Sequence, residues 1–86
     1  MRRESDDFGD LELSLLYMAS RLSDAQRLEK LLTDNDVDYL VETGTYTGGL
    51  LFARELTGAF FYVAPADLEN TRQLLVANRY KPYDGR

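Results

Sequence analysis

The stretch Ala59-Phe60-Phe61-Tyr62-Val63, followed closely by Pro65, decides the fold of this chain. All but one of its residues are large and apolar or aromatic, so both faces of an extended backbone carry bulk, which is typical of a strand covered on both sides. Such a strand belongs in the middle of a sheet. Pro65 is favoured in the first turn of a helix, so we expect a helix to follow it and to end near Asn78.

Residues 12–19 are expected to form the first strand of the sheet. Alternation places Leu15 and Tyr17 on one face of this strand and Leu16 and Met18 on the other. Both faces are therefore partly apolar.

A helix is expected after this strand. Ser23-Asp24-Ala25-Gln26 has the pattern of a capping box, in which the Ser23 hydroxyl accepts the backbone N–H of Gln26. Apolar residues then recur at helical spacing on one face, namely Ala25, Leu28, Leu31 and Leu32. Asn35 should end the helix, because asparagine tolerates the left-handed conformation found at many helix ends.

Residues 37–43 alternate well enough to predict a second strand. The glycine-punctuated residues 44–58 are expected to be a long connection, with an apolar patch at Leu50, Leu51 and Phe52. We rate a docking loop and a cover for the core as equal interpretations of this patch. Residues 79–83 are a candidate for a short fourth strand, which Pro82 would confine to an edge.

The resulting order, β-α-β-β-α, predicts an α+β fold of the ferredoxin-like kind, with two helices on one face of an antiparallel sheet. A right-handed crossover between the first two strands leaves a gap that the third strand can fill. We expect residues 11–83 to form this single domain, residues 1–10 to be a flexible N-terminal segment, and residues 84–86 to be a tail.

Two helices can cover only one face of the sheet, so the other face should expose large apolar side chains, namely Leu16, Met18 and either the pair Phe60 and Tyr62 or the pair Phe61 and Val63. Leaving three or four of them in water forgoes on the order of 5–10 kcal/mol, comparable with the whole stability of a domain. We therefore predict a homodimer or a higher even oligomer, with interface candidates Leu16, Met18, Phe61 and Val63. Alternatively, the N-terminal ten residues or the connection 44–58 could fold over that face.

Charge and composition exclude several classes of function. The chain has a net charge of -5, and such an acidic surface disfavours binding to nucleic acid and to anionic membranes. It contains no His and no Cys, so imidazole bases, thiol nucleophiles and thiolate zinc sites are excluded. We expect no enzymatic activity, no metal and no cofactor. No apolar run reaches membrane-spanning length and no export signal is evident, which favours the cytoplasm.

The Gly/Thr-rich segment is the most suggestive site for a ligand. Residues 40–49 resemble the first motif of S-adenosylmethionine-dependent methyltransferases, in which a strand leads into an acidic residue and a glycine-rich turn. The alternative function is therefore a cofactor-binding, enzyme-like domain that uses the turn Gly44–Gly49. Against it, a doubly wound methyltransferase sheet needs about twice this length. The candidate binding residues of this segment are Thr45, Tyr46, Thr47, Gly48, Gly49 and Phe52.

From about Leu15 to Tyr80 the chain resembles a family of short bacterial domains described as prokaryotic signal-transducing proteins. The matching pieces are the strand around Leu16, the helix over 24–32, the strand 37–41, and above all residues 61–69, where a strand leads through Pro65 into an acidic helix. The resemblance implies a PII-like, ferredoxin-type fold. With it we predict a non-catalytic regulatory or interaction module that binds a protein partner or a small ligand, with signal transduction as its expected role.

Overall fold

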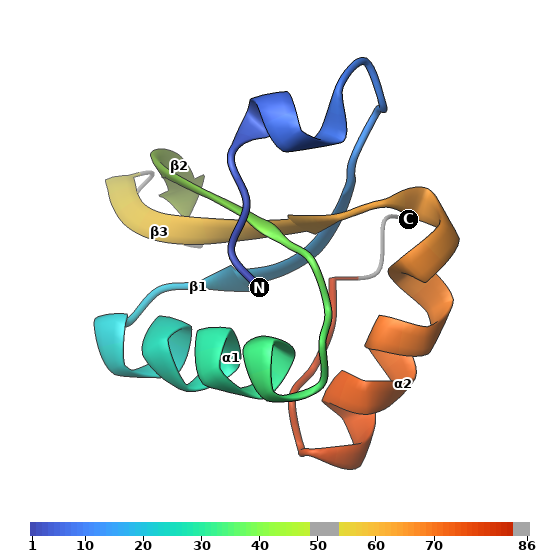
Figure 1. Ribbon diagram of the computed structural model, residues 1–86. Helices are drawn as coiled ribbons and strands as arrows, with labels where there is room; N and C mark the ends of the chain where they lie inside the picture. Colours follow the sequence, from blue (N-terminus) through green and yellow to red (C-terminus); the bar gives the residue numbers. More distant parts are fainter. Residues whose placement is uncertain (49–53, 84–86) are drawn as a thin grey trace.

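The computed structural model describes residues 1–48 and 54–83 and confirms the α+β class (Figure 1). Three strands and two helices make up most of the fold, with two short 3-10 helices, η1 and η2. The elements in chain order are η1 Ser5–Phe8, β1 Ser14–Ala19, α1 Leu22–Asp34, β2 Leu40–Gly48, β3 Arg54–Val63, η2 Pro65–Asp67 and α2 Leu68–Ala77.

β3 lies in the middle of the sheet, as its bulk on both faces predicts. The strand order is β1-β3-β2, and both outer strands run antiparallel to β3. β1 and β2 are therefore parallel to each other, and α1 connects them. The predicted antiparallel sheet with the third strand inserted between the first two is confirmed.

The hydrophobic core lies between the sheet and the two helices, which cover the same side of it (Figure 1). Phe61 and Val63 of β3 are fully buried in this core, and the Phe61 ring lies against Tyr39 with 5.9 Å between the ring centroids. The helices contribute Ala25, Leu28, Leu32 and Leu75. The buried Thr71 donates its hydroxyl to the carbonyl of Asp67 at 2.7 Å, so this polar side chain has a partner.

A β-bulge in β1 overturns the predicted alternation of that strand. Leu15 pairs with Tyr62 and Tyr17 pairs with Phe61, so Leu16 is the extra residue between two consecutive positions of β3. A bulge of this kind lets two successive side chains point to the same face. Leu16 is therefore fully buried in the core, whereas Met18, expected on the same face, is 42% exposed.

α1 begins one residue before the predicted capping box. Its N-cap is Arg21, which makes no side-chain capping hydrogen bond, so the assignment of Ser23 as the cap is wrong. The predicted end is confirmed at Asn35, whose side chain donates to the carbonyl of Leu31 at 2.8 Å. The left-handed residue is the next one, Asp36, with φ 58°.

α2 ends in the same way as α1. The side chain of its C-cap, Asn78, donates to the carbonyl of Leu74 at 2.9 Å, and Arg79 follows in the left-handed conformation with φ 67°. The backbone N–H of Tyr80 then donates to the carbonyl of Leu75 at 2.8 Å, which completes a Schellman motif. The equivalent bond after α1 joins Val37 to Leu32.

Most of the segment 44–58 is a β-hairpin rather than a long irregular connection. The pairing of β2 with β3 runs without interruption from Leu40↔Tyr62 to Gly48↔Arg54. The many glycines of this segment predict turns, but glycine also adopts an extended backbone, and here the cross-strand ladder holds it there. The apolar patch Leu50–Phe52 lies outside the described residues.

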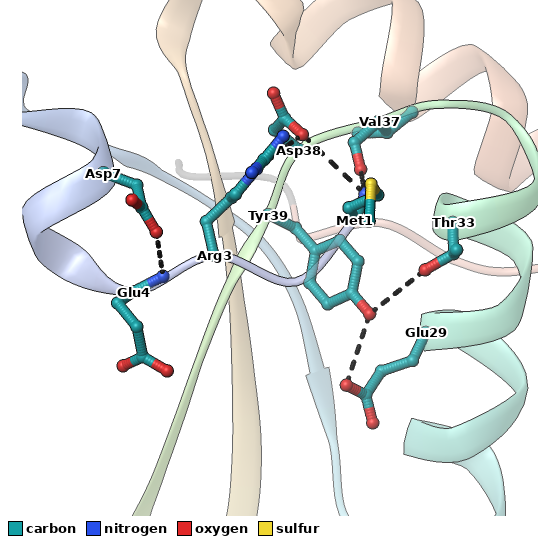
Figure 2. A network of polar contacts seen from close by, with 9 residues as sticks. All are labelled: Met1, Arg3, Glu4, Asp7, Glu29, Thr33, Val37, Asp38 and Tyr39. Carbon is teal, nitrogen blue, oxygen red and sulfur yellow. Dashed lines mark hydrogen bonds and ion pairs between the residues drawn. The ribbon is translucent and has the colours of Figure 1, made fainter.

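The first residues of the chain pair with Tyr39, which directly precedes β2 at the outer edge of the sheet. Arg2 forms a parallel bridge with Tyr39, and the N–H of Arg3 donates to the Tyr39 carbonyl at 2.7 Å. Arg3 Nε also donates to Asp38 Oδ1 at 3.0 Å (Figure 2). η1 then lies on the side of the sheet opposite the helices (Figure 1). Residues 1–10 therefore lie beside Tyr39 and over the face that the helices leave free; their flexibility stays a prediction.

Tyr39 joins this edge of the sheet to α1. Its hydroxyl donates to Glu29 Oε1 at 3.3 Å and lies 3.5 Å from Thr33 Oγ1 (Figure 2). Burial raises the pKa of Tyr39 above its usual value.

The C-terminal segment lies beside β1 but contains no assigned strand between residues 79 and 83. One backbone hydrogen bond links it to the sheet, from the N–H of Tyr83 to the carbonyl of Leu16 at 2.7 Å. The predicted tail 84–86 lies outside the described residues.

Candidate functional site: the β2–β3 hairpin and the open face of the sheet

The face of the sheet that α1 and α2 do not cover is here called the open face. Because Phe61 and Val63 point into the core, Phe60 and Tyr62 point to the open face. Cross-strand partners share a face, so two rows cross the sheet there. These rows are Met18–Phe60–Glu42 and Leu15–Tyr62–Leu40.

The two rows differ in exposure. Met18 and Glu42 are exposed at the two ends of the first row, with the half-buried Phe60 between them. All three members of the second row are half-buried. Burial and the negative charge of Glu42 raise the pKa of Tyr62 above its usual value. The row that contains Met18 therefore offers the more accessible apolar surface.

Next to the exposed row, the hairpin extends beyond the rest of the sheet as an arm, which we define as 44–48 and 54–58. β1 stops at the pair Ala19↔Ala59, whereas β2 and β3 remain paired to Gly48↔Arg54. In Figure 1 this end of the hairpin lies at the left, away from α2. Within the described residues, no strand lies beside either edge of the arm.

An apolar hollow of about 290 Å³ lies at the base of the arm. It is formed where the start of α1 faces the hairpin, and its lining includes Leu22, Ala25 and Ala59. Leu22 is 75% exposed, so it adds accessible apolar surface beside the hollow. Three features therefore adjoin one another at this end of the sheet: the arm, the hollow and the exposed row of the open face.

The predicted binding residues fall largely in the arm. The backbone of Thr45, Tyr46, Thr47 and Gly48 belongs to β2, and Gly49 and Phe52 lie outside the described residues. The strand-turn-helix geometry of a methyltransferase motif does not occur at Gly44–Gly48, because these residues continue a strand.

The four interface candidates divide between the two faces of the sheet. Leu16, Phe61 and Val63 are fully buried in the core of a single chain, so they present no surface to a second copy. Met18 alone of the four lies on the open face. Sequence reasoning left the orientation of residues 59–63 undecided, and it did not identify Leu15 as a residue of this face, because the bulge at Leu16 has no clear local signal.

The chemistry available on the open face is contact by aliphatic and aromatic groups. Within 1–48 and 54–83 there is no cluster of three or more acidic side chains placed to hold a metal ion. No helix in this part of the chain is long and apolar enough to cross a membrane.

Comparison with protein-family models, curated proteins and solved structures found no match to this chain. We therefore infer the function of this chain from its own geometry.

Proposed function

We propose that this chain is a non-catalytic interaction module that associates with a second copy of itself through the arm and the adjoining row Met18–Phe60–Glu42. The observation that carries the proposal is the extension of the hairpin by five cross-strand pairs, Gly44↔Gly58 to Gly48↔Arg54, beyond the end of β1. In this proposal, the interface of the homodimer lies at one end of the open face.

The arm needs a partner for a physical reason. Among residues 1–48 and 54–83 no strand lies beside the edges of the arm, and such edges carry backbone groups that can pair with another chain. Five pairs span about 17 Å at 3.4 Å per residue, enough for an edge-to-edge or face-to-face contact with a second arm. A second copy supplies such a contact by symmetry.

The exposed row adds apolar area beside the arm. Met18 is 42% exposed, and full burial of a methionine relative to exposure stabilises by about 1.5–3 kcal/mol. The N-terminal segment lies over the same side of the sheet, so a partner needs to cover only the part nearest the arm.

We also propose that the fold is ferredoxin-like, with the C-terminal segment in the place of a fourth strand. The hydrogen bond from Tyr83 to the carbonyl of Leu16 holds the C-terminal segment at the free edge of β1, where a fourth strand would complete a ferredoxin-like sheet. This supports the ferredoxin-like arrangement and agrees with the resemblance to the prokaryotic signal-transducing family. A regulatory role in the cytoplasm follows as part of the same proposal.

Sedimentation velocity and light scattering between about 1 and 200 μM test the association. We expect the wild-type chain to dimerise in this range and Met18→Asp to weaken the dimer at least about tenfold, because the new charge would have to be buried. Val76→Asp is the matched control, since Val76 is 63% exposed on α2 and lies away from the arm. Circular dichroism establishes that both variants are folded.

Hydrogen exchange locates the interface independently of mutation. The backbone amides of residues 44–48 should exchange more slowly as protein concentration rises through the dimerisation range. A wild-type chain that stays monomeric at 200 μM refutes the proposal. So does an equal loss of association in Val76→Asp and Met18→Asp.

A further inference from the structure

A second candidate site lies on the helical side of the molecule, between α1 and the segment that follows α2. There the structure contains a groove of about 700 Å³. α1 lines it with Arg27 and Lys30, the C-terminal segment with Arg79 and Lys81, and the tyrosines Tyr17 and Tyr80 form part of its wall. Ligand sites commonly have volumes of about 300–1,000 Å³.

The charge of this groove is opposite to that of the chain. Four of the ten basic residues line it, although the whole chain has a net charge of -5. Two acidic residues also line it, and both are engaged. Asp24 accepts a hydrogen bond from the Tyr17 hydroxyl at 2.7 Å, and Asp34 accepts one from Lys30 Nζ at 2.8 Å.

The remaining cations are available to a ligand. Arg27, Arg79 and Lys81 are exposed, and none of them forms an ion pair within the part of the chain that the structure describes. Two of the three are arginines on different elements, and the guanidinium group can bind a phosphate or carboxylate through two parallel hydrogen bonds.

The backbone of Arg79 is a separate observation that points to the same place. Arg79 has φ 67°, a left-handed conformation that glycine adopts freely and that costs energy for a residue with a Cβ atom. The equivalent residue after α1 is Asp36, a residue type that tolerates this conformation better. The Schellman motif at the end of α2 accounts for this conformation, and glycine would adopt it at lower cost, so an arginine at this position places a cation in the groove at the expense of some backbone strain.

The aromatic wall gives the groove a fixed shape. The rings of Tyr17 and Tyr80 meet edge to face, with centroids 5.6 Å apart and planes at 86°. The Tyr17 hydroxyl is already committed to Asp24, so the wall presents ring surface beside the cations.

We propose that this groove binds a compact small-molecule polyanion, held by Arg27, Arg79 and Lys81 against the wall of Tyr17 and Tyr80. The shared chemistry is two or more negative charges within a few ångströms, which a phosphorylated or a polycarboxylate metabolite provides. The site goes beyond the proposed self-association, because it lies on the helical side of the molecule and the arm lies at the end of the sheet.

Isothermal titration calorimetry at low ionic strength tests the proposal. One titration uses inorganic pyrophosphate and a second uses citrate, so the two experiments distinguish a phosphorylated ligand from a polycarboxylate. Binding of either anion by the wild-type chain, weakened by added salt, supports the site. Absence of binding by both anions overturns it.

Arg79→Gly provides the sharpest variant. Without ligand, it should raise Tm by about 4 °C because the backbone strain is relieved. It should also weaken binding of the anion at least about tenfold because a charged hydrogen-bonding group is lost. Asp36→Gly is the matched control. It relieves the same strain after α1 and should raise Tm while leaving the affinity unchanged.

Lys81→Gln is a second variant that does not depend on backbone strain. Lys81 is exposed in the C-terminal segment, and its replacement should weaken binding without changing Tm. Unchanged affinity in both Arg79→Gly and Lys81→Gln overturns the proposal, and so does an equal loss of affinity in Asp36→Gly.

Discussion

Raising the pH above 10 should destabilise this fold in part through Tyr17, and Tyr17→Phe should remove the contribution of Tyr17 to that sensitivity. The Tyr17 hydroxyl donates a hydrogen bond to Asp24 Oδ2 at 2.7 Å. Burial, together with this hydrogen bond and the negative charge of Asp24, raises the pKa of Tyr17 from 10.0 to about 12. The folded protein therefore holds the phenolic proton more tightly than the unfolded chain does.

The sign of the effect follows from this difference. The unfolded chain loses the Tyr17 proton near pH 10, so the contribution to stability is complete below pH 10 and is lost as the pH rises towards 12. One pKa unit corresponds to about 1.4 kcal/mol, so the rise from 10.0 to about 12 sets an upper limit of about 2.7 kcal/mol. Because the ring is only half-buried, water screens part of the interaction, and we expect a loss of about 1–2 kcal/mol.

Urea unfolding followed by circular dichroism from pH 8 to pH 12 measures this loss. At pH 8 the wild-type chain should be more stable than Tyr17→Phe by about 1 kcal/mol, the value of the hydrogen bond to Asp24. This advantage should disappear or reverse by pH 12. Tyr39, Tyr62 and Tyr80, whose pKa values burial also raises, are present in both proteins, so the difference isolates Tyr17. A difference that stays constant from pH 8 to pH 12 refutes the reasoning.

Three further changes test the packing and the edge of the sheet. Leu75→Ala should cost about 2–5 kcal/mol in urea unfolding, because Leu75 is fully buried between α2 and the sheet; a cost below 1 kcal/mol would contradict that placement. Gly44→Ala should raise the free energy of unfolding by about 0.5–1 kcal/mol, because its Cβ would make an ordinary contact with the Phe60 ring at 3.4 Å; a lower Tm would show that the ring cannot move. Arg3→Gln should cost less than about 1 kcal/mol, because its ion pair with Asp38 is exposed, and 1 M NaCl should reduce the cost further; a cost that salt does not change would rule out an electrostatic origin.

The central features of the fold could be predicted because local patterns encode them strongly. The bulk on both faces of residues 59–63 predicts a middle strand, and the structure has β3 between β1 and β2. The apolar stripe of residues 25–32 predicts α1, and Asn35 and Asn78 mark the ends of both helices. In each case residues within a few positions of one another decide the outcome.

The features that could not be predicted depend on residues far apart in the chain. The bulge at Leu16 exists because Leu15 and Tyr17 face consecutive positions of β3, and that register is unknown until the strands pair. The bridge between Arg2 and Tyr39 likewise joins segments with no local signal for each other. The sequence did not predict the strands of the arm, because glycine usually indicates a turn and the cross-strand pairing that keeps it extended here is not visible in the local sequence.

The proposed anion groove is compatible with the prediction, made from net charge, that the chain does not bind nucleic acid. Electrostatic effects between exposed charges fall off within about 8–10 Å at physiological salt, so a small anion responds mainly to the residues that line its site. The charged residues that line the groove are four basic and two acidic, although the chain as a whole is acidic. A long polyanion such as a nucleic acid extends past the groove and meets the acidic remainder of the surface, where it is repelled. The same charge distribution that disfavours nucleic acid is therefore compatible with a compact anionic ligand, and it requires that ligand to be small.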